Sequence, residues 1–166
     1  MPASIHPKRI TLIGKTIRLE PLSHAHVVAL AEVAFEPEIF RWFTIRMDDR
    51  ADLERWVADA IAAHAAGTAL PFATVLQDGN RVVGSTRFMN VSVKDGRYEI
   101  GSTWIAPSHQ RSAVNTEAKY LMLCHAFETL HARRVELKTH ELNDKSRRAI
   151  ERLGAQYEGM HRNHML

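Results

Sequence analysis

The residues with the clearest capacity for chemistry lie in the polar segment 110–119, which reads Gln-Arg-Ser-Ala-Val-Asn-Thr-Glu-Ala-Lys. A strand-like run, residues 98–105, precedes it, and an apolar, helix-like run, residues 117–130, follows it. In this order several backbone N–H groups point at one spot, where the helix dipole adds partial positive charge that suits a phosphate. From the residues alone, an ordinary helix start with Asn115 or Thr116 as N-cap explains the segment as well.

Ser146 lies in a second polar segment and is a candidate proton donor. On a helix it shares one face with Ala149, Ile150 and Leu153, at i+3, i+4 and i+7, so we expect its hydroxyl to face inward. An inward hydroxyl near a helix start can donate a proton to a leaving thiolate. The alternative is a hydroxyl that bonds locally to the backbone of its own helix.

The histidines and the cysteine do not predict a metal site. His24 and His26 are two residues apart and would point away from each other on a helix. His161 and His164 lack a cysteine or carboxylate at ligand spacing. Cys124 lies among apolar residues of the predicted helix 117–130, so we expect a small core residue there.

Hydrophobic periodicity, caps and turn residues predict the elements that position these residues, in the order βααβββαβαβ. The segments are a strand or hairpin edge at 10–20, a helix at 23–34, an aromatic loop or broken helix at 35–47, a helix at 48–67, strands at 72–76, 81–91 and 97–105, a helix at 117–130, a strand at 134–140, a helix at 143–153 and a strand from about 157. Helices on both sides of a central meander predict a three-layer α/β domain with a mixed sheet.

Composition narrows the class of protein further. The 166 residues suffice for one domain with a buried core, and no apolar run approaches the ~18 residues of a membrane span. A single cysteine and an N-terminus without a secretory h-region favour a cytoplasmic protein. The formal charge of +3 is spread along the chain without interleaved aromatics, which disfavours a nucleic-acid module.

The polar loop and the C-terminal segment together resemble the GCN5-related N-acetyltransferase superfamily. The matching residues are the Asn-Thr-Glu-Ala-Lys helix start at 115–119, the run Asn143-Asp144-Lys145-Ser146, and Leu153-Gly154-Ala155 with Glu158-Gly159. Within the superfamily they are similar to the branch that includes the ribosomal-protein N-terminal acetyltransferases. The resemblance implies an acyl-CoA N-acyltransferase-like α/β (α+β) fold, with a mixed sheet splayed between its fourth and fifth strands. It also implies that residues 1–166 form one domain, here without the family's usual last strand.

By resemblance, acetyl-CoA is the co-substrate, and no metal is needed. The cofactor-binding residues would be Trp104 and Ile105 on the splayed strand, Asn143, and the phosphate loop Gln110, Arg111, Ser112, Ala113, Val114, Asn115 and Thr116. The loop departs from the family pattern because Ala113 replaces a glycine and Asn115 replaces a second small residue. If position 113 requires positive φ, alanine costs roughly 1–2 kcal/mol there. Trp104 is equally well explained as a core aromatic.

The resemblance also supplies catalytic roles. Ser146 matches the general acid for the CoA sulfur. Glu99 on the splayed strand is the first candidate to deprotonate the amine, through a water; otherwise it is an exposed carboxylate paired with Arg97 or Arg87. A lysine amine near pKa ~10.4 costs about 4–5 kcal/mol to deprotonate at neutral pH, whereas an α-amine near 8 costs about 1. The catalytic glutamate of the ribosomal-protein branch aligns with Met165, and the adjacent His164 could substitute.

By resemblance, the acceptor would be a primary amine, either a protein N-terminus or a small molecule. Phe40, Trp42 and Phe43 would line its pocket, although the same aromatics could form a core lid or a homodimer contact. We therefore expect an acetyl-CoA-dependent N-acetyltransferase that works by direct attack of the amine. The alternative is a catalytically inactive CoA-binding or regulatory domain.

Overall fold

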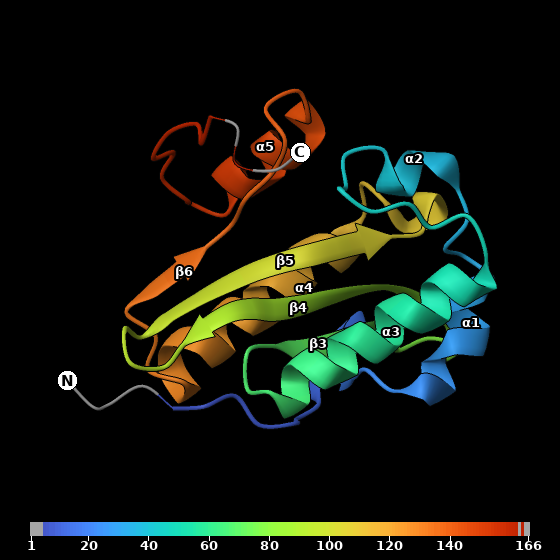
Figure 1. Ribbon diagram of the computed structural model, residues 1–166, viewed down its shortest axis with the longest axis horizontal. Coiled ribbons are helices and arrows are strands. Elements are labelled where there is room, and N and C mark those ends of the chain that lie inside the picture. Colours follow the sequence, from blue (N-terminus) through green and yellow to red (C-terminus); the bar gives the residue numbers. More distant parts are fainter. Residues whose placement is uncertain (1–4, 163, 165–166) are drawn as a thin grey trace.

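The computed structural model describes residues 5–162 and residue 164. Its centre is a six-stranded sheet in the order β1-β2-β3-β4-β5-β6, antiparallel throughout except for the parallel pair β5–β6 (Figure 1). The strands are β1 (Leu12–Ile13), β2 (Ile17–Pro21), β3 (Leu70–Leu76), β4 (Val82–Ser92), β5 (Arg97–Ile105) and β6 (Arg134–Glu136). The helices are α1 (Val27–Ala31), α2 (Pro37–Phe40), α3 (Arg50–Ala65), α4 (Ala113–Cys124) and α5 (Asp144–Arg152). Shorter turns are η1 (His24–His26), η2 (Pro107–His109) and the π-helical η3 (His125–Thr129).

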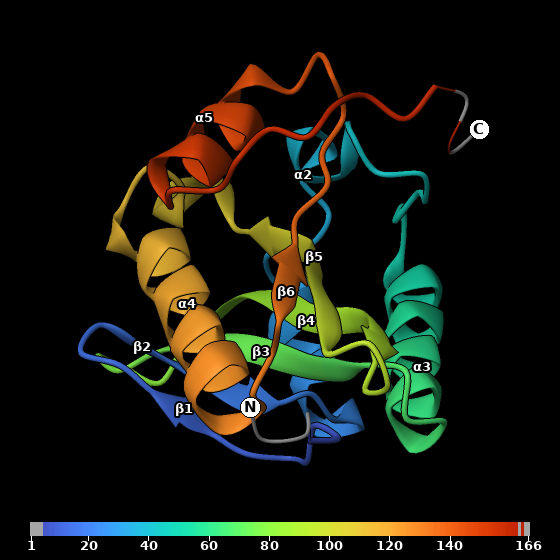
Figure 2. The same cartoon turned by 90° about the vertical axis from the view of Figure 1, so that its left-hand side faces the viewer.

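The sheet is covered on both faces, which confirms the predicted three-layer α/β arrangement. Figure 2 shows α4 on one side of the sheet and α3 on the other. One buried cluster joins the sheet to α4 through Val114, Ala118 and Met122. A second joins the opposite face to α3 through Leu53, Trp56, Val57 and Ala60. Each set recurs at helical spacing, so burial of one stripe fixes how each helix lies on the sheet.

The two long helices begin at polar caps and differ in how well the sequence predicts them. Asp49 caps α3 by accepting a hydrogen bond from the Asp52 N–H at 2.9 Å, and Gly67 follows its end with a φ of 77°. This helix matches its prediction closely. Helix α4 instead begins at Ala113, before the expected residue 117.

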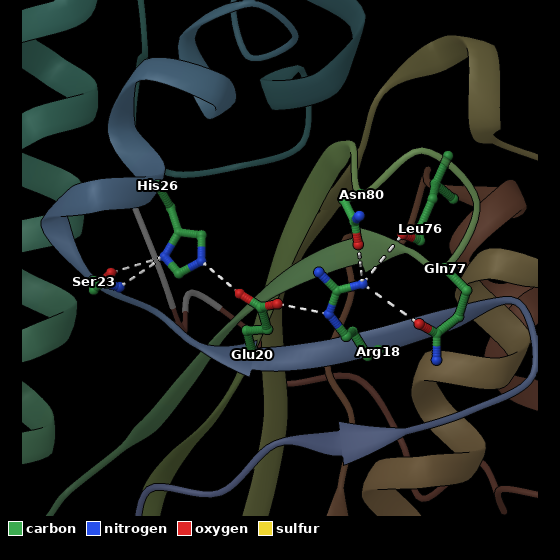
Figure 3. Close-up of polar contacts among 7 residues, drawn as sticks. All are labelled: Arg18, Glu20, Ser23, His26, Leu76, Gln77 and Asn80. Atoms are coloured by element: carbon green, nitrogen blue, oxygen red, sulfur yellow. Dashed lines mark hydrogen bonds and ion pairs between the residues drawn. The ribbon is translucent and has the colours of Figure 1, made fainter.

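A polar network ties the start of the sheet to its neighbours (Figure 3). The His26 ring accepts from the Ser23 N–H at 3.1 Å through Nδ1, and its Nε2 lies 3.1 Å from a Glu20 carboxylate oxygen. The other Glu20 oxygen accepts from Arg18 at 2.6 Å, and Arg18 donates onward to Asn80 at 2.8 Å. The network connects η1, β2 and the β3–β4 turn, so it fixes the predicted 10–20 hairpin against the rest of the sheet.

The C-terminal part of the chain differs from the prediction. Strand β6 ends at Glu136 rather than near 140, and residues 155–161 form no strand. Arg134 on β6 contacts the Glu158 carboxylate, so side chains rather than backbone pairing hold this tail beside the sheet. The expected strand from about Tyr157 is therefore wrong for these residues, and Tyr157 is 74% exposed. Among the described residues, no helix has the length and apolar character needed to cross a membrane.

Candidate active site

The polar loop forms a capped helix start, as expected, but its cap is a different residue. Ser112 is the N-cap of α4: its Oγ accepts from the Val114 N–H at 3.3 Å and donates to the His109 carbonyl at 2.6 Å. Asn115 and Thr116 lie inside the helix, so the expectation that either is the N-cap is wrong. The N–H groups of Arg111, Ser112 and Ala113 donate to no backbone carbonyl of the described residues. Their position at a helix N-terminus suits them to an anionic ligand.

The strained residue of the loop is Arg111 rather than Ala113. Arg111 has a φ of 60°, whereas Ala113 is the first residue of α4 and is not among the positive-φ residues. The conditional penalty for alanine at position 113 therefore does not arise. Alanine is a good helix former, so it suits this position better than glycine does.

Strand β5 has an outer edge that, among the described residues, is covered by a strand only at its beginning. Strand β6 pairs only with Arg97, Tyr98 and Glu99, after which the chain leaves the sheet and rises to α5 (Figure 1). Residues 100–105 of β5, here called the open edge, are therefore paired on one side only, by β4. Strands β5 and β6 correspond to the fourth and fifth predicted strands, because the predicted first strand covers the β1–β2 hairpin. The expected splay is confirmed.

Gln110 closes one end of the open edge. Its Nε2 donates to the Ile105 carbonyl at 3.0 Å, and its Oε1 accepts from Lys145 Nζ on α5. Trp104, by contrast, is 3% exposed and packs against Phe40 and Trp56, with ring centroids 5.6 and 6.2 Å away. The Trp104 side chain is thus a core aromatic, and only the backbone of this strand end lies at the open edge.

A bulge interrupts the pairing of β5 with β4 midway along the open edge. The register runs from Ser85–Trp104 to Arg87–Gly101, so β5 has one more residue than β4 between these pairs. Ser102 lies in the bulge with a φ of 46°. Bulges of this kind redirect backbone groups away from the ladder and are common beside active sites.

Lys119 lies behind this bulge, and the sequence reasoning missed it. Its ammonium donates to the hydroxyls of Thr103 and Thr86, the latter at 3.3 Å, and the residue is 6% exposed. Burial lowers the pKa of Lys119 to about 7. The helical period was the signal that could have found it, because position 119 falls on the same side of α4 as the buried Ala118 and Met122.

Glu99 is buried rather than exposed, and its partners are not the expected arginines. It is 5% exposed; Oε2 accepts from Asn90 Nδ2 at 2.8 Å and lies 3.0 Å from Lys138 Nζ. Arg87 instead lies over the Trp56 ring, 4.4 Å from its centroid. Glu99 Oε1 lies toward Gly101, where an added Cβ would be 3.4 Å from it. The carboxylate is therefore beside the beginning of the open edge.

The expected acceptor aromatics divide into two groups. Phe40 and Phe43 pack edge to face at 5.1 Å, and Phe40 continues onto Trp104. Trp42 lies 4.8 Å from the His140 ring, in the segment that follows β6. All three are half-buried. Phe40 and Phe43 therefore act at least in part as a lid on the core, while Trp42 faces the chain that leads to α5.

The two candidate proton carriers of the C-terminal segment lie in different surroundings. Ser146 is half-buried on α5, and its N–H donates to Asn143 Oδ1 at 3.1 Å, so Asn143 is the cap. Ala149, Ile150 and Leu153 are half-buried on the same face, as predicted. His164 is exposed and contacts His161 at 4.9 Å, and Met165 lies outside the described residues.

Among the described residues, no group of three or more His, Cys, Asp or Glu could hold a metal ion.

Comparisons with known proteins agree with this fold. The model of the acetyltransferase (GNAT) domain matches residues 16–156. A GCN5-related N-acetyltransferase from Brucella melitensis is 32% identical, with a TM-score of 0.88 over 98% of this chain and 75% of that one. An acetyl transferase from Salmonella typhimurium that modifies the N-terminal serine of ribosomal protein L7/L12 shares the fold at 18% identity, with a TM-score of 0.84 over 95% of this chain and 91% of that one. No curated protein matches the chain.

Proposed function

Because the chain belongs to the GNAT acetyltransferase family, we propose that this acetyl-CoA-dependent N-acetyltransferase acts on a primary amine, either a protein N-terminus or a small molecule. The observation that carries the proposal is that two backbone surfaces lie next to each other, neither of which pairs with a strand or helix carbonyl of the described residues on its outer side. The open edge of β5 ends where the loop of α4 presents the N–H groups of Arg111, Ser112 and Ala113. An extended chain with a diphosphate at one end matches both surfaces, because it can pair with a strand edge and place its charge at a helix N-terminus.

The loop and the strand would hold the co-substrate. Residues 111–116 would bind the diphosphate, with Arg111 adding a side-chain cation, and the backbone of Trp104 and Ile105 would pair with the pantetheine arm. Acetyl-CoA supplies an activated acetyl group in the form of a thioester. The Ile105 carbonyl already accepts from the Gln110 amide at 3.0 Å, and its second lone pair can accept a further hydrogen bond from the arm.

Glu99 would accept the proton that the acceptor amine loses. Its Oε2 is already engaged by Asn90 and Lys138, which orient the carboxylate, and Oε1 lies beside Gly101 at the open edge. Burial of the carboxylate excludes bulk water, so a proton would pass directly or through one bound water. His164 is an exposed second candidate in the tail.

Ser146 would donate a proton to the sulfur of the departing thiol. Asn143 caps α5 through the Ser146 N–H, which leaves the Ser146 hydroxyl available. Lys145, the preceding residue, donates to Gln110, whose own amide donates to the Ile105 carbonyl at the end of β5. The start of α5 is therefore linked through Gln110 to the open edge, along which the thioester arm would lie.

Two measurements test this function. Acetyl-CoA at a hundredfold its Kd should raise the free energy of unfolding by about 2.7 kcal/mol, read as a thermal shift. Release of free CoA thiol should then depend on an added amine, with N-terminal peptides and small polyamines as the panel. Binding without any amine-dependent thiol release would favour the alternative, a CoA-binding domain without turnover. Absence of binding would exclude both.

A further inference from the structure

Lys119 is a buried cationic side chain whose hydrogen-bond partners are neutral hydroxyls. Its side chain extends from α4 to the face of the sheet that α4 covers, where it donates to Thr86 on β4 and Thr103 on β5. The two hydroxyls also contact each other at 2.7 Å. An apolar residue would fill this core position at lower cost, because a buried amine must give up its hydration. The chemistry described above does not use it.

The lysine holds the part of β5 where the backbone is irregular. Thr103 directly follows Ser102, the bulge residue with a φ of 46°. The Thr103 hydroxyl also lies 3.4 Å from the Gly101 carbonyl, so it spans the bulge on the α4 face. A left-handed serine persists only where its surroundings determine it. Lys119 and Thr103 are those surroundings on this side of the strand.

We propose that Lys119 is a positioning residue for the acetyl group, holding the β5 bulge through Thr103 so that edge amides of the bulge polarise the thioester carbonyl. The proposal rests on the proposed function, because it assumes that acetyl-CoA lies along the open edge. Lys119 itself touches neither the thioester nor the amine. It acts from the opposite face of the sheet, through one side chain and the backbone.

The charge on the lysine adds a pH dependence to this role. When Lys119 is protonated, its positive charge behind the bulge increases the polarisation of the thioester carbonyl. Because burial lowers its pKa to about 7, this assistance is present below pH 7 and fades as the pH rises through that value. The acceptor amine responds in the opposite sense, since it reacts only after it loses its proton.

Other ionisable groups near the bulge contact different parts of the fold, so they do not take the place of Lys119 beside Thr103. Tyr98 and His125 lie on the same face but pack against Phe88, further along β4. Glu117 of α4 is bound by three N–H groups of the β1–β2 turn. Arg87 lies against α3, and Glu99 is held by Asn90 and Lys138.

The test follows the bound thioester and needs no acceptor. Acetyl-CoA labelled with carbon-13 at the carbonyl is added to wild type, Lys119→Met, Thr103→Val and the exposed control Lys94→Met. The carbonyl chemical shift of the bound molecule is followed by NMR across neutral pH, and Kd is measured in parallel. In wild type and Lys94→Met we expect the shift to move with a midpoint near pH 7. In Lys119→Met we expect no such midpoint, with Kd changed less than about threefold.

Each outcome decides the proposal. A wild-type shift that does not vary near pH 7, or that varies equally in Lys119→Met, overturns it. If Lys119→Met does not fold, Thr103→Val decides: it keeps the lysine but removes its link to the bulge, so an unchanged profile overturns the proposal and a weakened one supports it. Failure of the wild type to bind acetyl-CoA is a different result, which removes the proposed function itself.

Discussion

Lys138 Nζ lies 3.0 Å from Glu99 Oε2, so a side chain from beyond β6 holds the buried carboxylate of β5. The same stretch of chain places His140 against Trp42, 4.8 Å between ring centroids. The segment that leaves the sheet after β6 is thus attached at both the β5 carboxylate and the aromatic loop. These contacts connect the candidate base and one candidate acceptor aromatic to the same short segment, although the two residues are far apart in the sequence.

Replacement of Glu99 by glutamine should impair acetyl transfer to an extent that depends on the amine. For an amine of pKa ~10.4 we expect kcat/KM to fall roughly a hundredfold or more, because a base must remove the proton. For an α-amine near 8, little deprotonation is needed, and the loss should stay below roughly tenfold. Thiol release with matched peptides that offer either amine measures the difference.

Glu54→Gln is the matched control for this substitution, because Glu54 is an exposed carboxylate on α3 whose partner is Arg50. It should leave both rates unchanged. Equal losses for the two amines in Glu99→Gln would argue that Glu99 only supports the fold of the site, through Asn90 and Lys138, and is not the base.

Ser146→Ala should lower kcat while leaving acetyl-CoA affinity intact. The cap of α5 survives this change, because Asn143 accepts from the backbone N–H of residue 146 rather than from the hydroxyl. A thiol with a pKa of ~8.5 leaves without protonation at modest cost, so we expect a loss of about 10- to 100-fold. Ser108→Ala, an exposed serine of η2, is the control. A raised KM with unchanged kcat would assign Ser146 to binding instead.

The sequence was sufficient for most of the fold because its signals are local. Helix α3 matches its prediction, since the Asp49 cap, the apolar stripe from Leu53 and the Gly67 terminator are all readable in order. The prediction of a strand from about Tyr157 was wrong because strand formation depends on a partner strand and not on local signals alone. A strand there needs a neighbour to pair with, and β6 ends at Glu136, so no local pattern could report the outcome.

The candidate site was harder to predict because its key contacts are long-range. Ser146 could be oriented from the period of its own helix. Glu99 was identified, but its partner Lys138 comes from beyond another strand. The bulge at Ser102 depends on register between strands, which no single segment encodes. The burial of Lys119 could have been predicted from its helical face, but its hydrogen bond to Thr103 on β5 could not, because that contact is between separate elements.

Substitution of Ala113 by glycine, which restores the family pattern, should not improve binding of acetyl-CoA. Ala113 is the first residue of α4, so glycine there lowers the free energy of unfolding by up to about 1 kcal/mol. Arg111 has the positive φ, and Arg111→Gly should relieve about 1 kcal/mol of backbone strain while weakening cofactor binding through loss of the cation. Thermal unfolding and acetyl-CoA titration separate the two effects. Tighter binding by Ala113→Gly would contradict this assignment of the strained residue.

Glu117→Gln should destabilise the fold in a pH-dependent way, because the Glu117 carboxylate accepts from the N–H groups of Lys15, Thr16 and Ile17 at 2.6–2.9 Å. Partial burial raises the pKa of Glu117, but these three donors outweigh it, and the net pKa is lowered. A carboxyl with a lowered folded pKa stabilises the protein above its unfolded pKa of ~4.3 and loses that contribution as the pH falls below it. We expect a loss of about 1 kcal/mol at neutral pH, reduced from the value of a buried charged bond by solvent exposure. Urea unfolding at several pH values should show wild type and variant converging in acid.

Gly14→Ala provides the independent check, since its added Cβ would lie 2.7 Å from Glu117 Cδ and displace the carboxylate. In the double variant the two losses should be less than additive, and full additivity would mean that the carboxylate does not hold the turn.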